Sequence, residues 1–171
     1  MKVSDEQHAR LLSACTVLSK ARKVFYELHT EGVIAGNDNH IGDIGEYWVV
    51  RYYDRLGKDA QLAPKKNSDY DVRLNDGTRV AVRTLTPLAK NGRGLPVKPL
   101  DATKWTVLAA VKLDSNLGPE KLAVVTLSEL LSQDVFTRNQ NRMRRGEIKS
   151  YPAFRWWSFL DQHCVELDGL L

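Results

Sequence analysis

The sequence predicts an α/β fold of mixed α+β type, in which helices flank a small central mixed β-sheet. Two helix-like segments come first, a series of short strand-like segments follows, and a capped helix and an aromatic segment end the chain. The 171 residues suffice for one domain with a substantial core. A hydrophobic content of 43% and a charged content of 27% are ordinary for a soluble globular protein.

Two amphipathic helices are predicted before the strands. The first begins at a capping box, Ser4–Gln7, and ends near Gly32. The second begins near Asn37–His40 and ends at Gly57. It is apolar on more than one side, so we expect it to be buried, and Glu46 lies on one of the apolar flanks. The apolar positions at helical spacing are Leu11, Cys15, Leu18, Phe25 and Leu28 in the first helix and Ile41, Ile44, Trp48, Tyr52 and Leu56 in the second.

A β-hairpin is predicted within Asn67–Pro87, after a short candidate strand at residues 60–64. A two-residue loop would pair apolar positions with polar ones across the ladder. A three-residue loop, Asn75–Gly77, instead pairs Val72 with Val80 and puts Gly77 in the left-handed position. This register sets three further pairs opposite each other: Tyr70 with Val82, Asp71 with Ala81, and Asp69 with Arg83.

The remaining elements complete the sheet and its cover. Trp105–Leu113 is a nearly continuous apolar run and is predicted to be a central strand, with Lys121–Leu127 as another. Thr126 or Ser128 then caps a short helix. Residues 153–163 are predicted to form a helix that packs on the core rather than a platform for stacking bases. We expect one domain, made of an N-terminal helix (1–36), a core (37–133), and a basic loop with a C-terminal aromatic helix (134–171).

The composition limits the class of protein. Cys15 and Cys164 form neither a disulfide framework nor a zinc site, which favours a reducing compartment, the cytoplasm. No apolar run approaches the ~20 residues that span a bilayer, and the N-terminus lacks the apolar core of a signal peptide, so no membrane association is expected. A net charge of +4 and a pI near 9.1 permit a polyanionic partner.

Five stretches together resemble the PD-(D/E)XK, or restriction-endonuclease-like, nuclease superfamily. They are IGDIGEYWVVRYY, SDYDVRL, RVAVRT, WTVLAAVKLD and LAVVTLSEL, and they cover Ile41 to Leu131, about half the chain. The resemblance implies a nuclease-type core whose catalytic residues are Glu46 from a helix, Asp71 from the first hairpin arm, and Arg83 at the position of the family's lysine. It also implies Mg²⁺, or Mn²⁺, as the cofactor if the protein is active.

The hairpin departs from the family pattern at two positions. Ala81 stands where the family has a second carboxylate and cannot bind metal, and Arg83 is bulkier than lysine and holds its proton. Asp69 is the available substitute, so the predicted metal ligands are Glu46, Asp69 and Asp71. In the predicted register, however, an ion pair between Asp69 and Arg83 would engage both side chains.

Basic residues indicate a nucleic-acid partner, DNA in particular. The segment 137–149 is predicted to be a loop or a short helix, and its arginines are interleaved with amides that suit phosphate contacts. A run of charges is usually only a solvated face, but here two basic regions bracket the hairpin. The candidate nucleic-acid-binding residues are Lys65, Lys66, Arg93, Arg138, Arg142, Arg144 and Arg145.

Three functions follow as hypotheses. The first is a protein of nuclease-like fold that binds nucleic acid with weakened or lost metal-dependent hydrolysis. The second is an active Mg²⁺-dependent endonuclease that uses Glu46, Asp69 and Asp71. The third is a protein-binding module, such as an inhibitor, an immunity protein or a subunit of a phage-defence complex, on a pseudo-nuclease scaffold. A protein partner or a homodimer is compatible with each.

Overall fold

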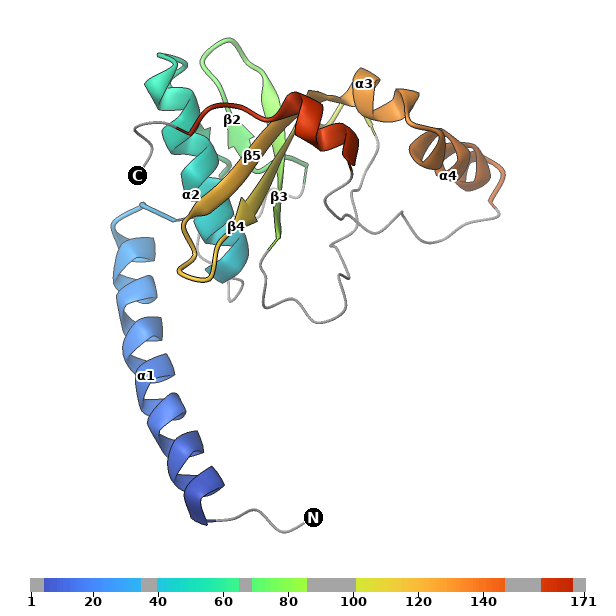
Figure 1. Ribbon diagram of the computed structural model, residues 1–171. Coiled ribbons are helices and arrows are strands. Elements are labelled where there is room, and N and C mark those ends of the chain that lie inside the picture. The colour runs from blue at the N-terminus through green and yellow to red at the C-terminus, as the bar shows by residue number, and fades with distance from the viewer. Residues whose placement is uncertain (1–4, 35–39, 65–68, 86–100, 147–157, 168–171) are drawn as a thin grey trace.

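The computed structural model describes residues 5–34, 40–64, 69–85, 101–146 and 158–167, and its architecture is a five-stranded mixed sheet with helices on both faces (Figure 1). The predicted mixed α/β fold is therefore confirmed. The helices are α1 (Asp5–Thr30), α2 (His40–Arg55), α3 (Leu127–Ser132), α4 (Asp134–Arg144) and the 3-10 helix η2 (Ser158–His163), and the strands are β1 (Gln61–Leu62), β2 (Val72–Arg73), β3 (Arg79–Leu85), β4 (Val107–Leu113) and β5 (Pro119–Thr126).

The strands lie in the order β1-β2-β3-β4-β5. All neighbours are antiparallel except β3 and β4, which run parallel with Val80 opposite Val107. A parallel pair needs a crossover connection, and residues 86–106 provide it. After η2 the chain forms an isolated bridge between Cys164 and Ala123, which covers part of the outer edge of β5.

The predicted hairpin register is confirmed, because Val72 pairs with Val80. Gly77 has φ +85°, and the Leu74 N–H donates to the Thr78 carbonyl, as a three-residue loop requires. The first arm is shorter than predicted, since β2 contains only Val72 and Arg73. The Asp71 N–H still donates to the Val80 carbonyl, but the Val82 N–H donates to the Asp71 carboxylate instead of to a backbone carbonyl of the first arm.

Two apolar clusters lie on opposite faces of the sheet. Because side chains alternate along a strand, Val80 and Val82 of β3 face the cluster that contains Val49 and Tyr53 of α2, while Ala81 faces the other. The second cluster is closed by side chains from α3, α4 and η2, namely Leu127, Leu130, Phe136 and Leu160. The sheet is thus buried on both faces, as its nearly continuous apolar strands predict.

Most of the helix limits agree with the sequence. Thr126 is the N-cap of α3, and a capping box with Glu129 is present. Of the basic segment predicted to be a loop or a short helix, residues 137–144 are helical as part of α4, and residues 147–149 lie outside the described residues. Of the C-terminal segment predicted to be helical, residues 158–163 form η2, and residues 153–157, including Trp156 and Trp157, lie outside the described residues.

A close contact between α2 and β3 holds the helix on the sheet. Gly45 is buried, and a Cβ atom at this position would overlap the side chain of Thr84. Thr84 is itself one of the few buried polar residues in the described part of the chain. Only glycine allows the helix backbone to approach this closely, so Gly45 fixes the height of the next residue, Glu46, above the sheet.

Gly45→Ala should therefore destabilise the protein by about 1–3 kcal/mol through overpacking. Urea unfolding measures the change, and Thr84→Ala in the same chain should recover part of the loss. Helix propensity alone would favour the opposite result, because alanine stabilises a helix by about 1 kcal/mol relative to glycine. A variant that is as stable as the wild type, or more stable, would show that the close approach to Thr84 is unimportant.

Candidate functional site

Glu46, Asp71 and Arg83 come together where α2 meets the sheet. Glu46 follows Gly45 on α2, Asp71 immediately precedes β2, and Arg83 lies on β3. The charges of Asp71 and Arg83 both act on Glu46. The three residues that the sequence assigns to catalysis are therefore neighbours in the structure, although their chemical roles remain predictions.

An ion pair joins the two strands at this point. Arg83 Nη1 lies 3.3 Å from Asp71 Oδ2 and also donates to the Val82 carbonyl at 2.5 Å. The side chains are 17% exposed for Arg83 and 29% exposed for Asp71, so water screens the pair only in part. Arg83 is therefore held against β3 by a carboxylate and a carbonyl group.

The Asp71 carboxylate has a second donor. Its Oδ2 atom accepts the Val82 N–H at 2.7 Å, a bond that takes the place of a ladder hydrogen bond between the strands. Burial raises the pKa of Asp71, although the Val82 N–H and the Arg83 guanidinium both act to lower it. Asp71 is thus a structural acceptor in the hairpin as well as a candidate ligand.

Glu46 is the most strongly perturbed acid of the site. Desolvation by burial, followed by the charges of Asp71 and Asp43, raises its pKa from 4.5 to about 8, and Arg83 offsets only part of this effect. Glu46 is therefore mostly protonated at neutral pH. In that state it can donate a hydrogen bond, but it is neither an anionic metal ligand nor a base.

Asp43 is the middle residue of an H-x-x-D-x-x-E spacing, His40 to Glu46, which invites a metal site but whose first and last residues lie well apart around a helix. It lies one turn before Glu46 on α2, is 1% exposed, and has its Oδ2 atom 3.9 Å from Nδ1 of His40. His40 is the first residue of α2, as expected, and its ring stacks on Phe25 at 4.3 Å. Asp43 lies three residues before Glu46, which puts both on the same side of the helix.

The predicted ion pair between Asp69 and Arg83 is wrong. Arg83 pairs with Asp71, and Asp69 pairs with Lys104, whose Nζ atom lies 2.6 Å from its carboxylate. The reason is that the regular ladder stops at Val72, so the predicted register does not extend back to Asp69. Lys104 was missed because the parallel pairing of β3 with β4, which brings the segment before β4 to this edge, is not visible in the hairpin sequence.

The missing carboxylate position belongs to the core. Ala81 is 2% exposed and packs in the apolar cluster with Trp105, Leu108 and Ala110. Among the described residues, no group of three His, Cys, Asp or Glu side chains is arranged to hold a metal ion. The metal-ligand role of Glu46, Asp69 and Asp71 therefore stays a prediction.

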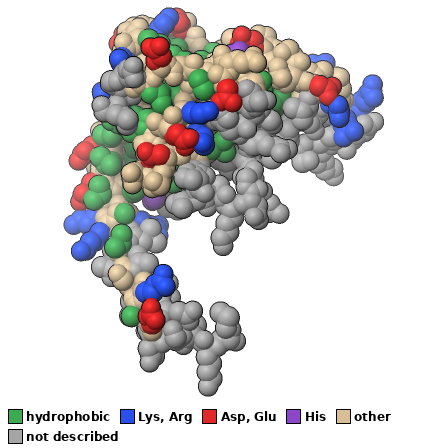
Figure 2. All heavy atoms as spheres, in the orientation of Figure 1, with side chains coloured by type: hydrophobic (Ala, Val, Ile, Leu, Met, Phe, Trp, Pro, Cys, Tyr) green, Lys and Arg blue, Asp and Glu red, His purple; other side chains and the backbone are tan. Residues whose placement is uncertain are grey.

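The arginines assigned to nucleic acid lie on and just after α4. Arg138, Arg142, Arg144 and Arg145 are all exposed, and Arg138 pairs with Asp134 one turn earlier. Figure 2 shows Lys and Arg side chains gathered at this end of the molecule. The other candidates, Lys65, Lys66 and Arg93, lie outside the described residues.

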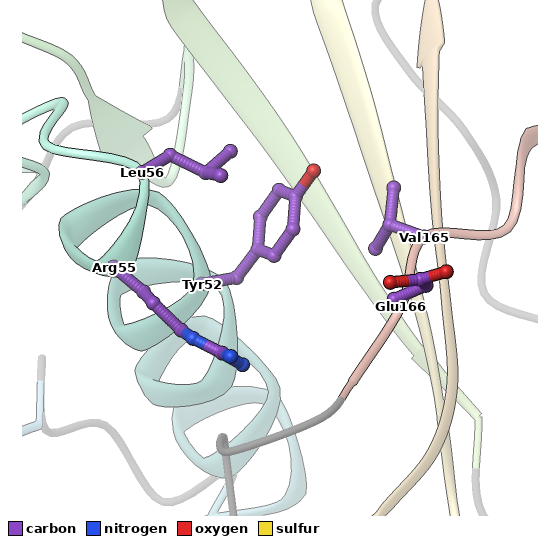
Figure 3. Close-up of a pocket in the computed structure, with 5 residues that line it drawn as sticks. All are labelled: Tyr52, Arg55, Leu56, Val165 and Glu166. Carbon is purple, nitrogen blue, oxygen red and sulfur yellow. The ribbon is translucent and has the colours of Figure 1, made fainter.

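A shallow pocket lies elsewhere, between α2 and the segment after η2 (Figure 3). Tyr52, Arg55 and Leu56 form one wall, and Val165 and Glu166 form the other. Burial raises the pKa of Tyr52. None of the residues of the candidate site lines this pocket.

None of the described helices combines the length and apolarity of a membrane span.

Comparison with known proteins gives a distant structural likeness. No family model matches the chain, and no curated protein matches its sequence. Among solved structures, a bacterial homing endonuclease is similar with a TM-score of 0.44 and 16% identity, over 57% of this chain and 74% of that one. The likeness is too low for any conclusion about activity, and we draw none from it.

The raised pKa of Glu46 should make stability depend on pH. Below pH 4.5 the Glu46 carboxyl is protonated in both the folded and the unfolded protein. Between pH 4.5 and about 8 only the folded protein keeps this proton, so the free energy of unfolding falls as the pH rises. From pH 5 to 8.5, the wild type should lose about 1–3 kcal/mol relative to Glu46→Gln, measured by urea unfolding at each pH. Glu166→Gln, at an exposed glutamate, is the control, and parallel curves for wild type and Glu46→Gln would refute the shift.

Proposed function

We propose that this chain is a pseudo-nuclease: a nucleic-acid-binding protein of PD-(D/E)XK-like fold, with DNA as the preferred partner, whose metal-dependent hydrolysis is weakened or lost. One observation carries the proposal. Asp71 is held by the Val82 N–H and by Arg83, while the neighbouring strand position that would carry a second carboxylate is Ala81, packed into the core. The Arg83 guanidinium therefore lies beside Asp71, where the family pattern would have a metal ion and a lysine.

The chemistry of the site supports binding better than hydrolysis. Cleavage of a phosphodiester needs an activated water and a cation that offsets the developing charge. Glu46 is mostly protonated at neutral pH, and Arg83 does not release its proton, so neither serves as a base. Arg83 can still hold a phosphate through its two-pronged guanidinium group, so the site suits a phosphate contact without bond cleavage.

The basic side of α4 supplies the electrostatic part of the proposal. Arg138, Arg142 and Arg145 recur at intervals of four and three residues, so they share one side of the helix. Phe136 lies on the opposite side, fully buried in the core cluster. The helix is therefore fixed by its apolar side while its arginines point to solvent, an arrangement that suits contacts with a phosphate backbone.

The first prediction concerns DNA binding. The wild type should bind duplex DNA with an affinity that falls steeply with salt, and the triple variant of Arg138, Arg142 and Arg145 to Ala should bind at least about tenfold more weakly with a smaller salt slope. Fluorescence anisotropy over a salt series measures both. The matched control removes three cations from α1, at Lys20, Arg22 and Lys23.

Two outcomes would contradict this assignment. If both triple variants weaken binding equally, net charge alone explains the affinity. If the wild type does not bind DNA or RNA even at low salt, the protein-binding alternative replaces the proposal, and a stoichiometric protein partner is then the observation to seek.

The second prediction concerns cleavage. With Mg²⁺ or Mn²⁺, the wild type should cleave plasmid DNA no faster than Asp71→Ala, because the site lacks a competent ligand set. Gel assays of supercoiled, nicked and linear forms provide the measurement. Metal-dependent cleavage that Asp71→Ala abolishes would instead assign an active endonuclease that uses Glu46, Asp69 and Asp71.

A further inference from the structure

The N-terminal helix has little support from the rest of the described chain. α1 projects from the sheet, and only its C-terminal end approaches α2 (Figure 1). There the Phe25 ring stacks on the ring of His40. Its 26 residues give a length of about 39 Å. Because helices in proteins gain most of their stability by packing an apolar face, a projecting helix of this length is expected to have a partner.

Large apolar side chains lie open to solvent on this helix (Figure 2). Val17 is 66% exposed and Val24 is 53% exposed, one heptad apart. Ala21 lies between them, and Leu28 follows, so the spacing from residue 17 is four, three and four. This is the spacing of a helix–helix seam, which we define as residues 10, 14, 17, 21, 24, 28 and 31.

Val17 and Val24, the exposed valines of the seam, lie well around the helix from the residue by which α1 meets the body. Phe25, which contacts His40, is one residue after Val24 and therefore about 100° away around the helix. A second helix can thus pack on Val17 and Val24 while Phe25 keeps its contact with α2.

We propose that the seam binds the α1 helix of a second copy of this chain in antiparallel orientation, which gives a two-fold symmetric dimer. In this orientation Val17 meets Ala21 of the second copy, so a larger side chain faces a smaller one. The two-fold axis repeats every contact. The seam is therefore complementary to itself, which favours a second copy over a different protein.

The charges at the two ends of the seam select the antiparallel orientation. Arg10 lies at one end and Glu31 at the other, and both are exposed. A parallel dimer would place Arg10 beside Arg10 and Glu31 beside Glu31. The antiparallel dimer brings Arg10 near Glu31 of the second copy, and such flanking pairs set the orientation of paired helices.

The test measures the oligomeric state of this chain in the absence of nucleic acid, by analytical sedimentation over a dilution series. The wild type should show a reversible monomer–dimer equilibrium, and Val24→Asp should weaken association at least about tenfold. Tyr26→Asp is the matched control, since Tyr26 is 71% exposed and lies about 200° from Val24 around the helix. It should dimerise like the wild type.

A charge exchange tests the orientation. Arg10→Glu should weaken the dimer severalfold, and adding Glu31→Arg to the same chain should restore it. A wild type that stays monomeric throughout, a dimer unaffected by Val24→Asp, or a monomer that captures a different protein on α1 would each overturn the proposal. DNA binding does not enter these measurements, so they are independent of the proposed function.

Discussion

The contact between Gly45 and Thr84 determines the geometry on which the rest of the site depends. It lets α2 lie directly on β3 and places Glu46 beside the Asp71–Arg83 ion pair, away from most of the solvent. A side chain at position 45 would move the helix away from Thr84 and let water reach Glu46. The burial that raises the pKa of Glu46 would then be smaller. The packing of α2 on β3 at Gly45 therefore also sets how far Glu46 is buried, and with it the pKa of Glu46.

The site balances its charges within the protein. The charges of Asp43 and Asp71 both act on Glu46, and Arg83 is the cation that the described structure pairs with Asp71. Because burial and like charges raise the pKa of Glu46 to about 8, a proton supplies the remaining compensation at neutral pH. In an active metal nuclease a divalent ion would fill this role. Under the pseudo-nuclease proposal, the Arg83 guanidinium and the proton on Glu46 take the place of that ion.

The sequence predicted the elements well and the site less completely. Alternation of apolar residues was enough to select the pairing of Val72 with Val80, because a shift by one residue would turn every side chain to the wrong face. The Lys104–Asp69 pair was not predictable, since it depends on a crossover between strands distant in sequence. The bond from the Val82 N–H to the Asp71 carboxylate was also not predicted, because side-chain bonds to the backbone leave no periodic signal.

The central claim is that Asp71 and Arg83 satisfy each other and leave no place for a divalent ion. Titration of the wild type with Mn²⁺, followed by electron paramagnetic resonance of the free ion, tests it most directly. We predict no stoichiometric Mn²⁺ site that Asp71→Asn removes. A single Mn²⁺ bound by the wild type and lost in Asp71→Asn would contradict the account and return the hairpin to the metal-dependent nucleases.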